Sequence, residues 1–223
     1  MAHMAEPGVR TRGHKKKERT RRRLIRAAID VIAAQGEAFT VSDVANRADV
    51  ANGTFYNYFP DRDALTDAVA TEVLAGFAEG GAEAVDDADP ACRFATITAL
   101  AFEYSAAAPD TMRAMLRLEA VQRAVDATAV VQHLRADLKA GVESGRFTVT
   151  DVDATLDVVI GSTLMATRRV VNGEATVAYR RAVIAQLVTS LGVAPADAAV
   201  VAALAVDRAS ELIMADAATP ANR

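Results

Sequence analysis

Residues 41–58, with the sequence VSDVANRADVANGTFYNY, constrain the fold of this chain more than any other stretch. Thr40 and Asp43 just before and within it have the spacing of a capping box, which predicts that a helix begins here. Apolar side chains then recur at helical spacing, and the helix is expected to stop near Asp49, because aspartate tolerates a left-handed turn better than most residues. A second short helix is predicted over 52–58. Two short helices joined by a sharp turn indicate a helix-turn-helix unit.

The second predicted helix carries polar side chains that are unusual in a protein core. Val50, Phe55 and Phe59 supply apolar contacts, and Tyr58 is expected to be half buried. Its other side chains can bond to base edges and phosphates, with a glycine where backbone must approach DNA: Asn52, Gly53, Thr54, Tyr56 and Asn57. The alternative is a buried helical hairpin with aromatic packing. Because an unpartnered buried polar group costs about 1–3 kcal/mol, the pattern favours a DNA-reading surface.

The region that contains these residues resembles the tetracycline-repressor (TetR) family of bacterial regulators. The resemblance covers roughly residues 17–70, at Ala27, Ala28, Gly36, Ala45, Ala48, Val50, Gly53, Thr54, Phe55, Tyr56, Tyr58, Phe59, Arg62 and Leu65. Three positions depart from the family pattern. Asp49 replaces the usual glycine, Ala51 replaces a serine that caps the recognition helix, and Arg62 replaces a lysine that contacts phosphate. Since a lost cap costs about 0.5–2 kcal/mol, Asn52 is expected to take over as the cap.

The resemblance implies a homodimer whose two recognition helices enter successive major grooves of a palindromic operator. Phosphate contacts would come from Thr40, Tyr56, Tyr58 and Arg62, and base contacts from Asn52, Thr54 and Asn57. A bound inducer would favour a dimer whose recognition helices no longer match the operator spacing.

Basic residues gather at the N-terminal end of a chain whose net charge is -4. Residues 1–62 hold 12 Lys or Arg against 7 Asp or Glu, whereas residues 63–223 hold 13 against 22. The run KKKERTRRR over 15–23 has seven positive charges and one negative charge. We expect a flexible arm in which Lys15, Lys16 and Lys17 follow phosphates or enter the minor groove; the alternative is a solvated charge run. This asymmetry favours double-stranded DNA as a partner.

Helical periodicity between Pro, Gly, Asp and Asn residues predicts an all-α protein. An N-terminal three-helix helix-turn-helix DNA-binding domain would be followed by a C-terminal helical ligand-binding and dimerisation domain. The expected boundaries are 1–14 for a disordered tag and arm, 15–60 for the DNA-binding domain and 61–223 for the second domain. Outside 41–58, helices are predicted over 16–35, 62–85, 90–107, 110–118, 121–144, 151–172, 176–191 and 195–215. The helix that Asp61 caps would contact both domains, so a ligand that moves it would move the recognition helix.

The resemblance also implies a dimer interface and a pocket for an inducer. The helices over 151–172 and 176–191 would form a four-helix bundle with their copies in a second subunit, with Val158, Val159, Ser162, Ala166, Ile184, Leu187 and Val188 as interface residues. An apolar or amphipathic inducer of unknown identity would lie among Phe77, Phe94, Phe102, Tyr104, Met112, Met115, Leu116, Glu119, His133 and Met165. The alternative for either set is that its members face only their own core.

Composition and motifs exclude several other classes. Cys92 is the only cysteine, which rules out an internal disulfide, favours a reducing compartment, and predicts a small buried side chain rather than a redox sensor. Scattered histidines predict no metal site and no cofactor. No nucleophile elbow, phosphate loop or close carboxylate pair is present, so we predict that the chain is not an enzyme. The absence of a long apolar run or signal peptide predicts a cytoplasmic protein without a membrane partner.

Two hypotheses from different classes remain. The first is a ligand-responsive transcriptional regulator, most often a repressor in this family. The second is a helical protein-interaction module that retains a vestigial DNA-binding motif, an alternative to which Asp49 and Ala51 lend support.

Overall fold

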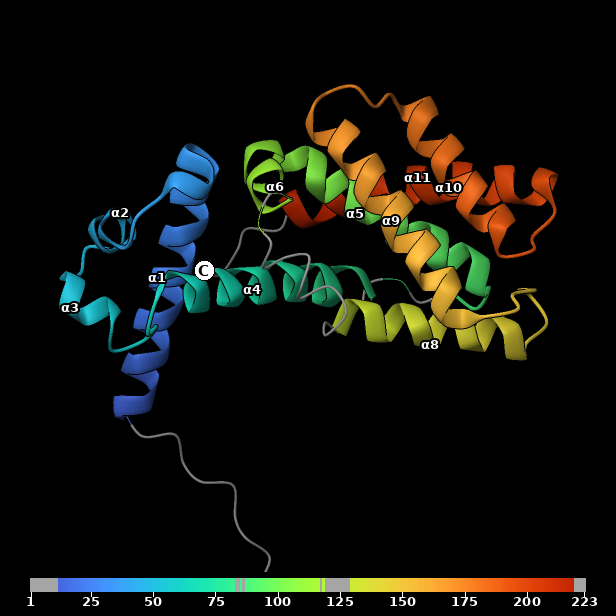
Figure 1. Cartoon of the computed structure of the whole chain (residues 1–223). Helices are drawn as coiled ribbons and strands as arrows, with labels where there is room; N and C mark the ends of the chain where they lie inside the picture. Colours follow the sequence, from blue (N-terminus) through green and yellow to red (C-terminus); the bar gives the residue numbers. More distant parts are fainter. Residues whose placement is uncertain (1–11, 83–84, 86, 117, 119–128, 219–223) are drawn as a thin grey trace, which may run out of the picture.

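The computed structural model describes residues 12–82, 85, 87–116, 118 and 129–218 (Figure 1). Over these residues every regular element is a helix and no strand is present, so the predicted all-α class is confirmed. The elements are α1 (Arg12–Gln35), the 3-10 helix η1 (Gly36–Ala38), α2 (Val41–Arg47), α3 (Asn52–Phe55), α4 (Arg62–Ala82), α5 (Pro90–Ala107), α6 (Pro109–Met115), α8 (Ala129–Glu143), α9 (Val152–Val171), α10 (Val177–Ser190) and α11 (Pro195–Ala218).

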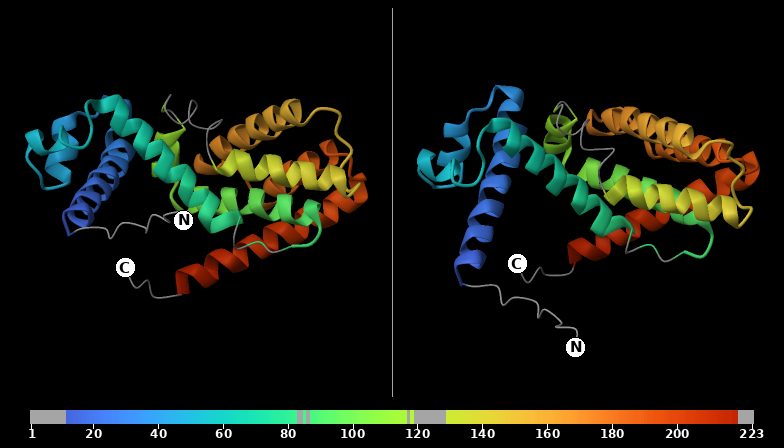
Figure 2. Two further views of the ribbon diagram at one scale, coloured as in Figure 1. Left: turned by 90° about the horizontal axis from the view of Figure 1, so that it is seen from below. Right: turned by 60° about the horizontal axis from the view of Figure 1, so that its bottom comes forward.

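Two hydrophobic cores organise the chain. The N-terminal core lies among α1, α2, α3, the first half of α4 and α6, and the C-terminal core lies among α5, α8, α9, α10 and α11. Helix α4 leaves the N-terminal core and packs against α5 and α8, while α11 lies along α5 and α10 (Figures 1 and 2). One long helix therefore contacts both parts of the molecule, as the sequence predicts.

The N-terminal core forms around the inward face of α1. Its most buried residues from α1 are Leu24, Ile25, Ala28 and Ile32, none more than 1% exposed. Val44 from α2, Phe55 from α3 and Leu65 from α4 are fully buried against this face. Burial on this scale is worth about 1.5–3 kcal/mol for each large apolar side chain, which holds the two short helices in place.

Helix starts agree closely with the predicted caps. Asp61 Oδ1 accepts a hydrogen bond of 2.8 Å from the backbone N–H of Ala64, so this residue caps α4 as expected. Helices α9 and α10 begin one residue after the predicted positions, because the side chains of Asp151 and Thr176 are their N-caps. At the other end of α1, Gly36 has a φ of +66°, the left-handed conformation that terminates a helix.

The basic segment differs from the prediction. Helix α1 spans Arg12–Gln35, so the helix predicted over 16–35 is confirmed. Residues 12–14, predicted to be disordered, are helical, and the run over 15–23 is part of this helix rather than a flexible arm. Local interactions account for this, since Glu18 pairs with Arg22 at 3.2 Å one turn away and the hydroxyl of Thr20 donates to the carbonyl of Lys16 at 3.2 Å. Residues 1–11 lie outside the described part of the chain.

Other boundaries also shift. Helix α3 ends at Phe55 and continues as a turn over 56–58, whereas the sequence predicts helix up to Tyr58. Helix α4 is described up to Ala82 and Val85 is not helical, whereas the prediction runs to residue 85; residues 83 and 84 lie outside the described residues. Helix α6 spans Pro109–Met115 instead of 110–118. The predicted helix over 121–144 is seen from Ala129 as α8, and its first part lies among residues 119–128, outside the described residues.

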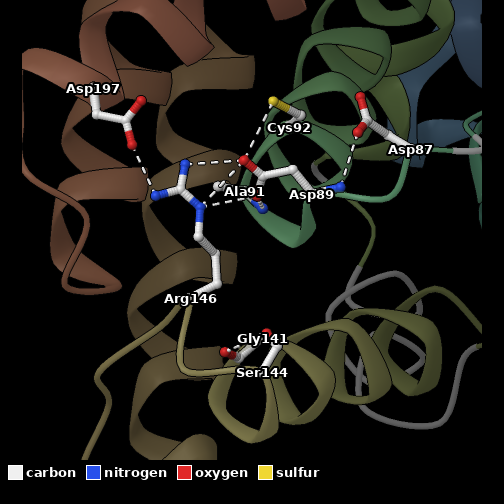
Figure 3. Close-up of polar contacts among 8 residues, drawn as sticks. All are labelled: Asp87, Asp89, Ala91, Cys92, Gly141, Ser144, Arg146 and Asp197. Carbon is white, nitrogen blue, oxygen red and sulfur yellow. Dashed lines mark hydrogen bonds and ion pairs between the residues drawn. The ribbon is translucent and has the colours of Figure 1, made fainter.

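An ion cluster joins three segments at one end of the C-terminal core (Figure 3). Asp89, the N-cap of α5, accepts bonds from Arg146 Nε at 2.9 Å and Nη2 at 3.0 Å. Arg146 Nη1 lies 2.8 Å from Asp197 in the first turn of α11. The hydrogen bonds from Arg146 lower the pKa of Asp89, whereas burial and the nearby Asp89 carboxylate raise the pKa of Cys92 to about 11. One arginine thus holds the starts of α5 and α11 to the segment after α8.

Candidate nucleic-acid interface

The predicted capping box at the start of α2 is present. The Thr40 hydroxyl accepts from the backbone N–H of Asp43 at 3.2 Å and donates to Asp43 Oδ2 at 2.7 Å. The same oxygen accepts from the backbone N–H of Thr40 at 2.8 Å. These hydrogen bonds from Thr40 lower the pKa of Asp43. The Thr40 hydroxyl donates its hydrogen to Asp43, so a phosphate contact from this hydroxyl would have to share or replace that hydrogen bond.

The turn between α2 and α3 uses a left-handed residue, as the sequence predicts. Asp49 has a φ of +52°, and the chain closes around it through the N–H of Val50, which donates to the Ala45 carbonyl at 3.0 Å. Arg23 Nη2 reaches from α1 to donate to the Asp49 carbonyl at 3.1 Å. One residue of the basic run therefore holds the helix-turn-helix together, a role that sequence spacing did not reveal because the partners are 26 positions apart.

Helix α3 separates an apolar face from a polar face. Phe55 is 0% exposed, and its ring contacts the Tyr56 ring edge-on with centroids 5.3 Å apart. Tyr56 is nevertheless 57% exposed, and Asn52, Gly53 and Asn57 are exposed beside it. Among the remaining predicted DNA contacts, Thr54 and Tyr58 are half buried. The helix therefore presents a polar surface on a fixed apolar base.

The expected transfer of the helix cap to Asn52 is wrong. Ala51 is the N-cap of α3 and has no side-chain hydrogen bond, while Asn52 is the first helical residue. The Asn52 amide instead donates to the Ser42 hydroxyl at 2.9 Å, which links α3 to α2. Without a side-chain cap, the first backbone N–H groups of α3 remain available to an external acceptor.

Two arginines lie over aromatic rings and border this surface. Arg62, at the start of α4, lies 5.3 Å from the centroid of Phe39, next to Thr40 in the chain. Arg21, from α1, lies 5.4 Å from the centroid of Phe59, next to Tyr58. Such contacts contribute about 0.5–1 kcal/mol at exposed sites and fix where the charge lies. They place positive charge beside both ends of the helix-turn-helix.

The predicted lysine contacts lie on the first turns of α1. Lys16 and Lys17 are exposed. Lys15 belongs to the same helix, but its side chain lies outside the described residues. These charges are therefore carried by a helix anchored in the N-terminal core.

The residues predicted to line one ligand pocket are distributed between two cores and the surface. Phe94 and Phe102 are buried in the C-terminal core and Tyr104 packs against it, whereas Met112 and Met115 belong to the N-terminal core. Leu116 is 9% exposed. His133 is exposed on α8, Met165 is 54% exposed on α9, and the side chains of Phe77 and Glu119 lie outside the described residues. The described members thus divide between two cores and the surface, a distribution that apolar character alone does not predict.

The predicted dimer residues divide into two groups. Val158, Ser162, Ala166 and Leu187 line an open groove of about 650 Å³ along α9 and α10. Val159, Ile184 and Val188 do not line the groove and are buried in the C-terminal core, to which Ala166 and Leu187 also belong. The groove also includes Met165, which the sequence assigned to the pocket, and Gly161, Val183 and Gln186, which it did not single out. Which of these residues faces the groove depends on how α9 and α10 are rotated about their axes, and packing alone decides that rotation.

A second, smaller crevice of about 340 Å³ lies between α5 and α11, and Cys92 lies on its wall. In the described part of the chain, no three His, Cys, Asp or Glu side chains come together as a potential metal site. None of the described helices is long and apolar enough to cross a membrane.

A capped helix, a left-handed turn and a short exposed polar helix, set on a core shared with α1, define a helix-turn-helix DNA-binding protein with a helical second domain. Residues 24–69 match the family model described as bacterial regulatory proteins, tetR family. Over these residues the chain is similar to the tetR family, which agrees with the helix-turn-helix described above.

A curated relative supports this similarity within the N-terminal region. The uncharacterized HTH-type transcriptional regulator YvdT of Bacillus subtilis (strain 168) is 40% identical over 53 residues, which cover 23% of this chain and 27% of that protein. The chain is thus matched to only about a quarter of the length of this relative.

Solved structures extend the likeness to most of the chain. RolR without ligand is 27% identical with a TM-score of 0.61, over 82% of this chain and 96% of that one. RolR in complex with resorcinol has a TM-score of 0.58 and 27% identity, over 84% and 95% of the two chains. FadR from Bacillus subtilis, in complex with stearoyl-CoA, has a TM-score of 0.66 at 23% identity, over 76% and 98%. The FadR likeness concerns the fold alone.

Proposed function

We propose that this protein is a homodimeric transcriptional repressor that binds a palindromic operator and is released by a small apolar or amphipathic molecule. The observation that carries the proposal is the division of α3 and the turn after it: Phe55 is completely buried, whereas Asn52, Tyr56 and Asn57 lie in solvent. A bacterial regulator of this kind acts on chromosomal DNA in the cytoplasm.

The exposed groups of α3 and of the turn after it match what a major groove offers. Asn52 and Asn57 carry amides that can donate to and accept from base edges, and the half-buried Thr54 adds a hydroxyl. The phenol of Tyr56 and the guanidinium of Arg62 can bond to flanking phosphates, and Gly53 allows close approach of the backbone. The exposed Lys16 and Lys17 would add contacts that weaken as salt rises.

Substitution of Tyr56 tests the DNA contact. Genomic fragments bound by the wild type would first yield an operator duplex, and fluorescence anisotropy would then measure its affinity for Tyr56→Ala and Tyr56→Phe. We expect Tyr56→Ala to lower the affinity about tenfold or more, since it removes a phosphate contact and the packing that orients it. Loss of the exposed ring costs only about 0.5–1.5 kcal/mol of stability, so the variant stays folded. Unchanged affinity in Tyr56→Ala would remove α3 from the interface.

The groove along α9 and α10 is where we place the second copy of the chain. Val158 and Met165 are 56% and 54% exposed there, an uncommon state for two large apolar side chains on one helix face. Gly161 and Ser162 lie between them in the chain and also line the groove, so another helix can approach closely. Two copies meeting through this face would form the four-helix bundle that the family resemblance implies.

Two valines of equal exposure test this interface. Val158→Glu is expected to raise the dimer dissociation constant about tenfold or more, because a charge would be buried without a partner. Val200 on α11 is 57% exposed and does not line the groove, so Val200→Glu is the matched control and should leave the dimer intact. Sedimentation equilibrium measures both. Dissociation by Val200→Glu with an intact Val158→Glu dimer would place the interface on α11.

The release step is supported by RolR, whose structure is known both without ligand and with resorcinol. Release by a ligand requires that it bind the DNA-free conformation more tightly than the DNA-bound one. Resorcinol is therefore a suitable first probe, followed by larger apolar and amphipathic compounds. Anisotropy with the operator should show lower affinity when an effective compound is present. Operator affinity that stays equal with every compound that binds the protein would contradict ligand-controlled release.

A further inference from the structure

We infer that Arg113 is a positioning residue that fixes the DNA-binding part of each protomer to helix α9, and thereby sets the spacing of the two recognition helices. The inference rests on the proposed function, because spacing matters only to a dimer that reads two half-sites. Its evidence is independent of the residues that would contact DNA.

The first observation is where α6 packs. In the chain α6 follows α5, yet the buried residues Ala114, Met115 and Leu118, from α6 and just after it, belong to the N-terminal core. Helix α6 packs against α1 and also against α9 (Figure 1). It is therefore packed into the N-terminal core while remaining in contact with the C-terminal domain.

The second observation is the contact that Arg113 makes across this boundary. Its Nη2 donates to the carbonyl of Val171 at 2.6 Å, and Nε lies 3.4 Å from the side-chain oxygen of Asn172. Val171 is the last residue of α9 and Asn172 is its C-cap. Asp110 Oδ1 accepts from Nη1 at 2.5 Å, which orients the guanidinium from within α6.

The chemistry of this contact suits a permanent link. The last carbonyls of a helix have no partner in the helix, and they carry the negative end of its dipole. A cation that donates to one of them therefore makes a hydrogen bond and also interacts favourably with the dipole. A guanidinium stays charged at every relevant pH, and its planar fork can serve Asp110 and Val171 at the same time. A lysine would offer a point charge and would not hold both groups in one plane.

The third observation is what α9 carries. The same helix presents Val158 and Met165 to the groove proposed for the second copy. A path of packed elements thus leads from the N-terminal core through α6 and Arg113 to α9 and to the partner. Loosening Arg113 would leave each recognition helix intact but let the two DNA-binding parts vary in separation and angle.

Two arginines at opposite ends of α9 provide the test. Arg113 and its partner Asp110 are 37% and 78% exposed. Arg135 on α8 pairs with Asp153 in the first turn of α9, and these side chains are 34% and 75% exposed. Arg135→Ala therefore removes a comparable pair from the same helix at the end away from α6. Each variant would be measured against the operator, a single half-site, and operators whose half-site spacing is changed by one or two base pairs.

We expect Arg113→Ala to lower the affinity for the correctly spaced operator about tenfold, which is within the range for residues that couple two sites. It should bind the single half-site like the wild type and discriminate less between spacings. Arg135→Ala should match the wild type on every duplex, and Arg113→Lys should restore only part of the loss. Circular dichroism and sedimentation equilibrium would verify that each variant folds and dimerises.

Two results would overturn the assignment. Wild-type behaviour of Arg113→Ala on all duplexes would show that the contact is not needed for spacing. An equal loss on half-site and operator would show that the variant damages the recognition helix itself. Failure of the wild type to bind any duplex is a different outcome, because it would refute the proposed function and the role of Arg113 with it.

Discussion

Replacement of Arg146 by methionine is expected to lower the free energy of unfolding by about 2 kcal/mol. Methionine keeps much of the aliphatic length of arginine but removes the donors to Asp89 and Asp197 (Figure 3). Asp89 would remain the N-cap of α5 through its bond of 2.8 Å to the N–H of Ala91. The variant therefore isolates the link between the segment after α8 and the starts of α5 and α11.

The magnitude follows from burial. A fully buried pair costs about 3–5 kcal/mol to break, whereas an exposed pair contributes about 0–1 kcal/mol. The side chain of Arg146 is 27% exposed, and those of Asp89 and Asp197 are 36% and 47% exposed. The cluster lies between the two limits, and its bidentate geometry on Asp89 favours a value above that of a surface pair.

The loss should depend on pH in a predictable direction. Arg146 holds the pKa of Asp89 below its usual 3.8 in the folded protein. A carboxyl with a lowered pKa contributes stability above its unfolded-state pKa and loses it as the pH falls through the folded-state value. In Arg146→Met the pKa of Asp89 would return toward 3.8. The stability difference between wild type and variant is therefore expected to be full at neutral pH and to shrink below about pH 4.

Urea unfolding followed by circular dichroism would measure the difference at about pH 7 and about pH 3, at one fixed protein concentration because a dimer unfolds in a concentration-dependent way. Arg208→Met is the matched control. Arg208 and Glu211 lie 4.0 Å apart and are 62% and 68% exposed, so its effect should stay within about 0.5 kcal/mol. A loss in Arg146→Met no larger than the control, or equal at both pH values, would refute the reasoning.

Three further changes test local features. Gly141→Ala should lower stability by about 1–3 kcal/mol, because the added Cβ would lie 2.0 Å from a ring carbon of buried Phe147; an unchanged melting temperature would contradict this packing. Asp49→Gly should raise stability by about 0.5–1 kcal/mol in thermal unfolding, since glycine adopts the φ of +52° without strain, and a loss would show that the aspartate side chain contributes. Cys92 should react with iodoacetamide near pH 8 roughly 100-fold more slowly than in the urea-unfolded chain, because its pKa of about 11 replaces a usual 9.0; equal rates would show an ordinary thiol.

Sequence predicted best those features that nearby residues determine. The capping box of Thr40 and Asp43, the cap at Asp61 and the left-handed Asp49 all depend on partners within a few positions, so their spacing is visible in the chain. The exposed face of α3 followed from the same logic, since its aromatic and polar residues alternate at helical spacing. The length of α3 could not be predicted in this way, because Phe55 and Phe59 are held in place by the core and not by a continued helix.

Features that depend on distant partners were predicted less well. Arg23 was assigned to a phosphate-following arm, yet it bonds to the carbonyl of Asp49. The pocket residues were grouped by apolarity, and the structure separates Phe102 from Met115 into different cores. Val159 and Val158 are adjacent in sequence, but one is buried and the other faces the groove, a distinction that depends on how α9 is rotated against α5.

Helix α6 shows why the domain boundary itself is a tertiary property. A boundary drawn at residue 61 puts α6 in the C-terminal domain, whereas Met115 is 1% exposed within the N-terminal core. Its seven residues are too few to form a stable helix alone, so α6 exists only through what it packs against. Helix α6 is buried in the N-terminal core and is bonded through Arg113 to the C-terminal domain. Any shift of α9 against α1 must therefore either move α6 or break that bond. Helix α6 is therefore, beside α4, a second element that contacts both parts of the molecule.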